Sequence, residues 1–223
     1  GVPVKRFERP MFGYLTRDEV LAVIGKPGDS WLSQRDHALF LLMYNTGARV
    51  SEIIGIKVGD VVLDASAACV HLHGKGRKQR SVPLWRSSVK AIRAWLHTNP
   101  QFEATSPLLP NRSGREMTRA NVMLRLALAI QRAMESQPAL AKRQISPHTI
   151  RHTTAMHLLQ SGVDISVIAL WLGHESPVTT HHYVEADLAM KERALAKLHE
   201  PDAKIQRYRA PDSLLDFLKT LRL

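Results

Sequence analysis

The spacing of apolar positions predicts a chain that is mostly helical. Apolar residues recur at intervals of three and four along several stretches, which places them on one face of a helix. The expected helices cover residues 16–24, 33–45, 50–56, 87–97, 118–135, 146–160 and 164–172. Several of these stretches begin at Ser, Thr or Asp and end before Gly, as helix caps require.

Two stretches break this helical spacing and predict strands. Residues 68–73 and 79–84 are β-like runs, and the basic turn GKGRK separates them. The glycines and lysines of that turn are typical of a hairpin tip. The expected fold class is therefore mainly α with a small antiparallel β-sheet (α+β), either a hairpin or a three-stranded sheet.

The composition narrows the choice of cellular compartment and of binding partner. With 223 residues and 44% hydrophobic residues, the chain can bury a substantial core without crosslinks. The single cysteine, Cys69, has no partner, which favours a reducing compartment and a buried packing role. The excess of 31 Lys and Arg over 20 Asp and Glu favours a polyanionic partner, either nucleic acid or an anionic membrane surface.

No apolar run approaches the roughly 18 residues that cross a bilayer, so a cytoplasmic, nucleoid-associated protein is the simpler interpretation. Basic residues without acidic neighbours also fill the stretch between Asp64 and Glu103. Such a run is often only a solvated face, but this one spans a hairpin and a helix, which favours phosphate contacts. DNA contacts are expected from four basic residues. They are Arg77, Lys78, Arg80 and Arg119.

The first candidate for chemistry is Arg49, in the motif TGARVSE. It follows a buried helix and a glycine turn, so its guanidinium would lie at the edge of the core, where it can grip two oxygens of one phosphate. Glu52 stands three residues later and could hold it in place. An ordinary ion pair on the surface of a helix is an equal alternative for these two residues.

The hairpin tip carries a second candidate, Lys75. Flanking glycines allow the tip to approach a ligand closely, and neighbouring cations would lower the pKa of the lysine so that it could donate a proton. A plain phosphate contact is the alternative. Neither a Walker loop nor a GxGxxG motif is present, so nothing in this turn indicates a nucleotide cofactor.

A third group of candidates lies between Ser146 and Tyr183. His148 and Arg151 are three residues apart on one helix face, which lets both reach one ligand. A metal site at His148 and His152 is disfavoured, because the HExxH order is missing and a cationic arginine stands between them. His174 ends the motif LGH, and Tyr183 follows nine residues later.

These motifs, in this order, resemble the catalytic domain of the tyrosine recombinases, the phage-integrase and Xer-type family. The motifs that carry the resemblance are TGARVSE, GKGRKQRSVPL, SPHTIRH, LGH and the tyrosine nine residues later, within residues 16–198. The resemblance implies a mainly helical domain with a small sheet that recombines DNA at specific sites. It also implies that no metal or nucleotide cofactor takes part.

The resemblance further implies a role for each candidate. Tyr183 would be the nucleophile that forms a 3'-phosphotyrosyl link, while Arg49 and Arg151 would clamp the scissile phosphate. Lys75 would protonate the departing 5'-oxygen. The supporting roles are divided among three residues: His148 would assist proton transfer, His174 would bind a non-bridging oxygen, and Glu52 would support the site.

The same resemblance predicts the organisation of the chain. Residues 1–15 would be a linker from an absent DNA-clamping domain, residues 16–200 the catalytic domain, and residues 201–223 a tail helix exchanged between protomers. The chain would thus be either a fragment or a minimal member, acting on double-stranded DNA as a homo-oligomer, a tetramer on DNA formed from monomers in free solution. Two alternatives remain: relaxation of DNA like that of a type IB topoisomerase, and a basic DNA-binding module without catalysis.

Overall fold

The computed structural model describes residues 13–64, 67–74 and 79–173. The α-helices of this part are α1 (Arg17–Ile24), α2 (Trp31–Thr46), α3 (Val50–Ile54), α4 (Arg86–His97), α5 (Arg119–Ala133), α6 (Pro147–Gln160) and α7 (Ile165–Leu172). The remaining elements are the 3-10 helices η1 (Val58–Asp60) and η3 (Pro138–Lys142) and the strands β1 (Val61–Val62), β2 (Cys69–His73) and β3 (Gln79–Pro83). Contacts divide the chain at residues 187 and 188, and everything described below lies in the first unit.

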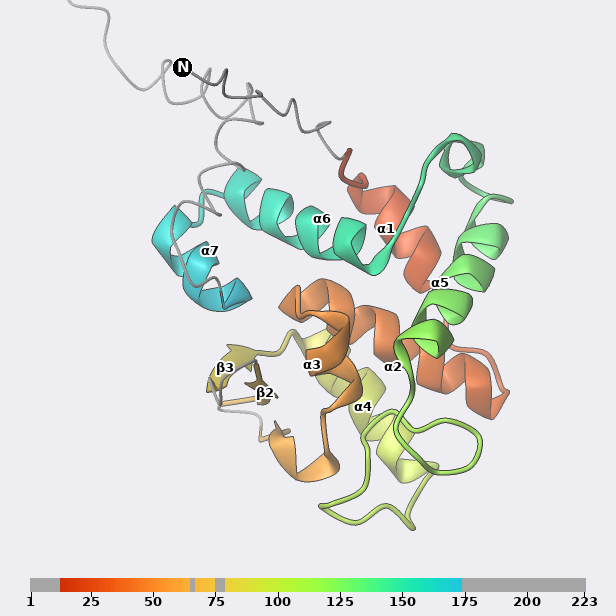
Figure 1. The fold of residues 1–223 in the computed structure, drawn as a ribbon, viewed down its shortest axis with the longest axis vertical. Coiled ribbons are helices and arrows are strands. Elements are labelled where there is room, and N and C mark those ends of the chain that lie inside the picture. The colour runs from red at the N-terminus through yellow and green to blue at the C-terminus, as the bar shows by residue number, and fades with distance from the viewer. Residues whose placement is uncertain (1–12, 65–66, 75–78, 174–223) are drawn as a thin grey trace, which may run out of the picture. The chain divides into compact units, whose positions relative to one another are not determined.

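Helix α2 lies at the centre of the helical part. Its residues 38–46 are all buried, and α1, α4 and α6 pack against it (Figure 1). Ser30 caps its start by accepting a hydrogen bond from the Ser33 amide. Gly47 ends it in the left-handed conformation, at φ 57°, which glycine adopts without strain. The core of the domain is therefore built around a helix that ends two residues before Arg49.

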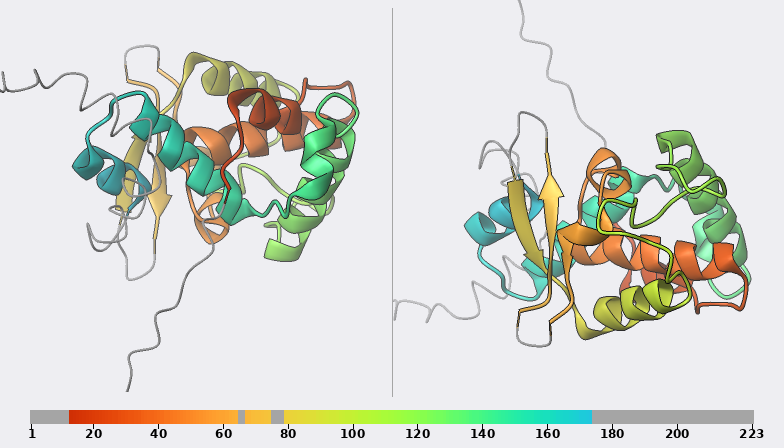
Figure 2. Two further views of the ribbon diagram at one scale, coloured as in Figure 1. Left: turned by 90° about the horizontal axis from the view of Figure 1, so that it is seen from above. Right: turned by 90° about the horizontal axis from the view of Figure 1, so that it is seen from below.

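The sheet is antiparallel, with strand order β1-β2-β3. Its face toward the core carries Val70, Leu72 and Val82, which are fully buried. The register pairs Leu72 with Arg80 and His73 with Gln79. Helix α7 contacts β3 and α3 contacts β2, so the sheet lies at one end of the helical layer, as Figure 2 shows.

The expected fold class is confirmed, and β1 decides for the three-stranded alternative. Helix α2 begins two residues before the expected position, because Ser30 rather than a later residue caps it. The prediction of a buried Cys69 is wrong: Val70 takes the core side of β2, so the preceding residue points to the other side and is only partly buried. None of the helices in the described part is long and apolar enough to cross a membrane.

Candidate active site

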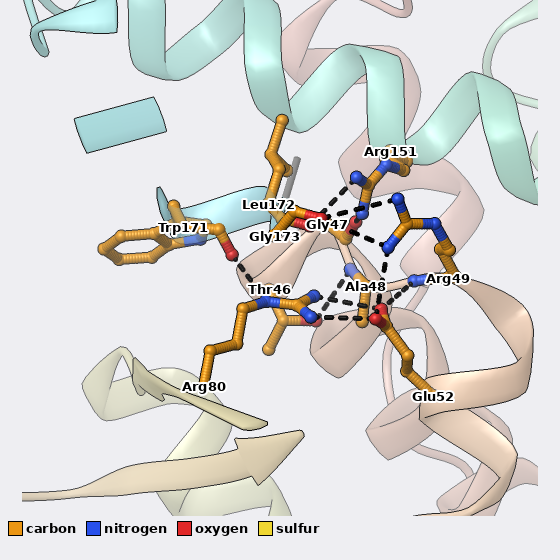
Figure 3. Close-up of polar contacts among 10 residues, drawn as sticks. All are labelled: Thr46, Gly47, Ala48, Arg49, Glu52, Arg80, Arg151, Trp171, Leu172 and Gly173. Carbon is orange, nitrogen blue, oxygen red and sulfur yellow. Dashed lines mark hydrogen bonds and ion pairs between the residues drawn. The ribbon is translucent and has the colours of Figure 1, made fainter. Parts of the chain in front are cut away.

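Arg49 is held where the end of α2 turns into α3. It is the N-cap of α3, and its side chain is 47% exposed. The Glu52 carboxylate accepts a hydrogen bond from the Arg49 amide at 2.7 Å and from its guanidinium at 3.3 Å (Figure 3). The backbone of Arg49 is thus tightly fixed, while its guanidinium keeps much of its surface free of protein.

The partner of Arg49 is not on the surface, which removes the alternative of an ordinary helix-surface pair. The side chain of Glu52 is 2% exposed and receives a second arginine, Arg80 of β3. The two terminal nitrogens of Arg80 donate to the two carboxylate oxygens at 2.8 and 2.9 Å, a bidentate geometry. Its Nε donates to the carbonyl oxygen of Trp171 at 2.9 Å.

The pKa of Glu52 shows which effect prevails in this pair. Burial pushes the pKa of the carboxyl upward, because a charge is costly away from water. The hydrogen bonds from Arg80 and from the Arg49 amide, together with both guanidinium charges, outweigh burial and leave the pKa below its ordinary value. Glu52 is therefore a buried carboxylate ion.

Arg151 approaches the same place from α6. Ser146 caps the start of that helix, as the sequence predicted, and Pro147 is its first residue. The side chain of Arg151 is buried, and it donates to the carbonyl oxygens of Gly47 at 2.6 Å and Leu172 at 2.9 Å. It joins the end of α2 to the end of α7.

Arg49 and Arg151 converge on adjacent carbonyl groups. Both terminal nitrogens of Arg49 lie 3.4 Å from the carbonyl oxygen of Gly173, one residue beyond the Leu172 carbonyl that Arg151 binds (Figure 3). These carbonyls belong to the C-terminal end of α7, which carries partial negative charge. The arrangement brings two guanidinium groups from distant parts of the sequence to adjacent carbonyl oxygens.

The close approach of these segments depends on two glycines. A Cβ on Gly47 would lie 2.5 Å from Cδ2 of Leu172, and a Cβ on Gly173 would lie 2.8 Å from a terminal nitrogen of Arg80. Both glycines also have positive φ. Gly47 therefore provides a turn and space for the side chain of Leu172, and Gly173 provides a turn and space for the guanidinium of Arg80.

Charge is unbalanced around this cluster. Arg49, Arg80 and Arg151 contribute three positive charges and Glu52 contributes one negative charge. His148, in the first turn of α6, has a lowered pKa because of partial burial and then because of the charges of Arg151 and Arg49. A neutral imidazole therefore lies close to two arginines.

Several predicted residues lie outside the described part of the chain. They are Lys75, Arg77, Lys78, His174 and Tyr183. Lys75 belongs to the segment that joins β2 to β3, and His174 directly follows Gly173. Arg119 is exposed at the first residue of α5, a helix that packs against α1 and α3.

The structure adds most to the interpretation of Arg80, which the sequence analysis expected to contact DNA. A signal was present in the alternation of β3: Arg80 lies two residues from Val82 and so shares its inward face. The carbonyl acceptors at Gly47, Trp171 and Leu172 carry no such signal, because any residue type has a carbonyl group. Only the glycines that end α2 and α7 hint at them.

Known proteins resemble this chain in sequence and in fold. The model of the phage integrase family matches residues 13–190. The chain belongs to the phage integrase family. It is 43% identical over 222 residues to y4rC of Sinorhizobium fredii, named as an integrase/recombinase, covering 99% of this chain and 66% of that protein. It is 41% identical over 179 residues to the tyrosine recombinase XerC of Neisseria meningitidis, covering 80% of this chain and 56% of that protein.

Solved structures of recombinases show the same fold. The crystal structure of XerA recombinase matches with a TM-score of 0.71 at 25% identity, covering 90% of this chain and 68% of that one. XerH recombinase bound to a palindromic difH substrate matches with a TM-score of 0.69 at 23% identity, covering 82% and 52%. The chain spans between about half and two thirds of the length of the curated relatives named above.

Proposed function

We propose that the chain is the catalytic part of a site-specific DNA recombinase that cuts and rejoins strands through a 3'-phosphotyrosyl intermediate. The observation that carries this proposal is the convergence of Arg49 and Arg151 on the Leu172 and Gly173 carbonyls. The oxygens of a scissile phosphate accept hydrogen bonds from N–H donors, as those carbonyl oxygens do, and the phosphate also carries a full negative charge. Membership of the phage integrase family supports the assignment.

In the proposed reaction the phenol oxygen of Tyr183 attacks the phosphorus atom and the bond to the 5'-oxygen breaks. The phenol proton passes to His148, whose lowered pKa keeps it neutral and able to accept. Lys75 gives a proton to the departing 5'-oxygen. Arg49 and Arg151 bind the non-bridging oxygens and stabilise the charge that grows on them, with His174 as a further donor.

The ester formed with Tyr183 retains the energy of the broken bond. A 5'-hydroxyl of a second strand can therefore attack it, restore the diester and release the phenol. In cleavage and in rejoining, each bond broken is matched by a bond formed and each proton released is taken up, without a nucleotide or a metal ion. Covalent storage thus explains how strands could be exchanged rather than only cut.

The proposed partner is double-stranded DNA, bound by several copies of the protein in the cytoplasm, at the nucleoid. XerH was solved on its difH substrate, and lambda integrase was solved as a dimer bound to a core site. The formal net charge of +11 is suited to a polyanion. Recombination requires two sites, so four protomers would assemble on paired DNA.

The test is covalent capture on a library of nicked DNA duplexes, in which cleavage releases a short fragment and leaves the protein trapped. Wild-type protein is expected to give an adduct that survives denaturant, and Tyr183→Phe is expected to give none. If wild-type protein binds DNA but captures no member of the library, it is a binding module. If it relaxes plasmids without joining two sites, it acts as a type IB topoisomerase.

A further inference from the structure

Arg80 and Arg49 compete for a single carboxylate. Arg80 holds both oxygens of Glu52 at 2.8 and 2.9 Å, whereas the guanidinium of Arg49 reaches one of them at 3.3 Å. The side chain of Arg80 is 15% exposed and that of Arg49 is 47% exposed. The inner arginine therefore neutralises the carboxylate, and the outer one is left largely available.

Removing Arg80 would change the position of Arg49. Glu52 is a buried ion, and a buried ion that loses its partner is strongly destabilised. The nearest remaining cation of the cluster is the guanidinium of Arg49, which could restore the pairing only by turning inward onto both oxygens. That movement would withdraw its N–H groups from the exposed site.

We infer that Arg80 is a positioning residue for the proposed cleavage reaction: by saturating Glu52, it keeps the guanidinium of Arg49 directed at the scissile phosphate. This inference rests on the proposed function. It replaces the expectation that Arg80 contacts DNA.

The other contacts of Arg80 tie it to the segments around Arg49. Three of the five N–H groups of a guanidinium are committed, two to Glu52 and one to the Trp171 carbonyl. The group also packs against Gly173, where a Cβ would lie 3.0 Å from its Cζ. One side chain thus joins β3, α3 and the end of α7, the three segments around Arg49.

The first measurement separates rate from affinity. With Arg80→Gln, the cleavage rate at saturating DNA is expected to fall roughly 100-fold, the usual effect of losing one donor to a developing oxyanion. DNA affinity is expected to stay within a few-fold of wild type. A direct phosphate contact predicts the reverse: weaker binding, a salt slope reduced by about 0.9, and a near-normal rate when DNA saturates.

A double-mutant cycle then tests the route through Glu52. If Arg80 acts by keeping the Glu52 carboxylate from drawing Arg49 inward, then removing that carboxylate charge removes the need for Arg80. Arg80→Gln should therefore cost no further rate in a Glu52→Gln background. Losses that multiply would overturn the inference. Arg132→Gln removes an exposed arginine at the end of α5 and is the matched control, expected to cleave at the wild-type rate.

A substrate with sulfur in place of the bridging 5'-oxygen tests the other route, through Lys75 on the hairpin. A thiolate leaves without being protonated, since a thiol has a pKa of about 8.5, so this substrate should rescue Lys75→Ala. Arg80→Gln is expected to remain slow on it. Full rescue of Arg80→Gln would mean that Arg80 acts on the lysine, and would overturn the route through Arg49.

Two further comparisons separate the inference from the proposed function and from misfolding. If wild-type protein forms no adduct, the proposed function fails; if wild type reacts and Arg80→Gln loses only affinity, this inference alone fails. Arg80→Lys keeps a charge beside Glu52 and so protects the fold, but an ammonium cannot bind both oxygens as a fork does. It should melt near the wild-type temperature and cleave about tenfold slower, a loss of about 1.4 kcal/mol in transition-state stabilisation; a wild-type rate would overturn the inference.

Discussion

Removing Arg151 should destabilise the fold as well as the reaction. Arg151→Ala leaves the carbonyl oxygens of Gly47 and Leu172 without their charged donor. Hydrogen bonds to a charged group contribute about 1.5–3 kcal/mol each, so the two together contribute about 3–6 kcal/mol. Water entering the vacated space would satisfy part of this demand, which favours the lower end, about 3 kcal/mol, still a large share of the 5–15 kcal/mol typical of a domain.

Equilibrium unfolding in urea, followed by tryptophan fluorescence, measures this loss, because Trp171 adjoins Leu172 in α7. Arg151→Lys can satisfy one carbonyl at a time and should lose about half as much, since lysine lacks the planar fork. The exposed Arg132→Ala should change the free energy of unfolding by less than about 0.5 kcal/mol. If Arg151→Ala also stayed within about 0.5 kcal/mol of wild type, the reasoning would be refuted.

Three further predictions concern the turn, the carboxylate and the imidazole. Gly47→Ala should lower the melting temperature. The left-handed backbone at this position costs an alanine about 1–2 kcal/mol, and the new Cβ would meet Leu172. An unchanged melting curve would contradict this. The pKa of Glu52 is lowered in the folded state, so its stabilising contribution is complete above its unfolded pKa and is lost as pH falls through the folded value. The stability advantage of wild type over Glu52→Gln, from urea unfolding, should therefore shrink on acidification, and a constant difference would count against an ion pair. The pKa of His148 is lowered, so kcat/KM for cleavage should decline only below the ordinary histidine pKa of about 6.5. This decline should be absent in His148→Gln, and a pH profile identical to that of wild type would exclude His148 as the proton acceptor.

The secondary structure could be predicted well because its signals are local. Thr16 and Glu19 form a capping box at the start of α1, and Gly47 and Gly173 end their helices in the left-handed conformation. The β-like runs and the basic turn between them placed β2 and β3 correctly within one residue. The error at Cys69 arose from treating a short apolar run as uniformly buried, although a strand sends alternate residues to opposite faces.

The geometry of the site could be predicted only in part. The sequence marked Arg49 and Arg151 as candidates by residue type and spacing, but their meeting depends on the packing of α6 and α7 against the end of α2. The burial of Glu52 was not evident either, because a carboxylate three residues after an arginine fits a solvated helix equally well. Only the packing of the folded chain decides between a buried Glu52 and a solvated one.

The pairing of β2 with β3 limits how this hairpin can vary between related chains. Arg80 stands opposite Leu72 and shares its face of the sheet with Val82, so inserting a single residue between Arg80 and Val82 would turn the side chain of Arg80 away from Glu52. Insertions between His73 and Gln79 would leave that orientation intact. Natural variation in loop length should therefore concentrate in this short interval, where it would alter the reach of Lys75 without disturbing the arginines.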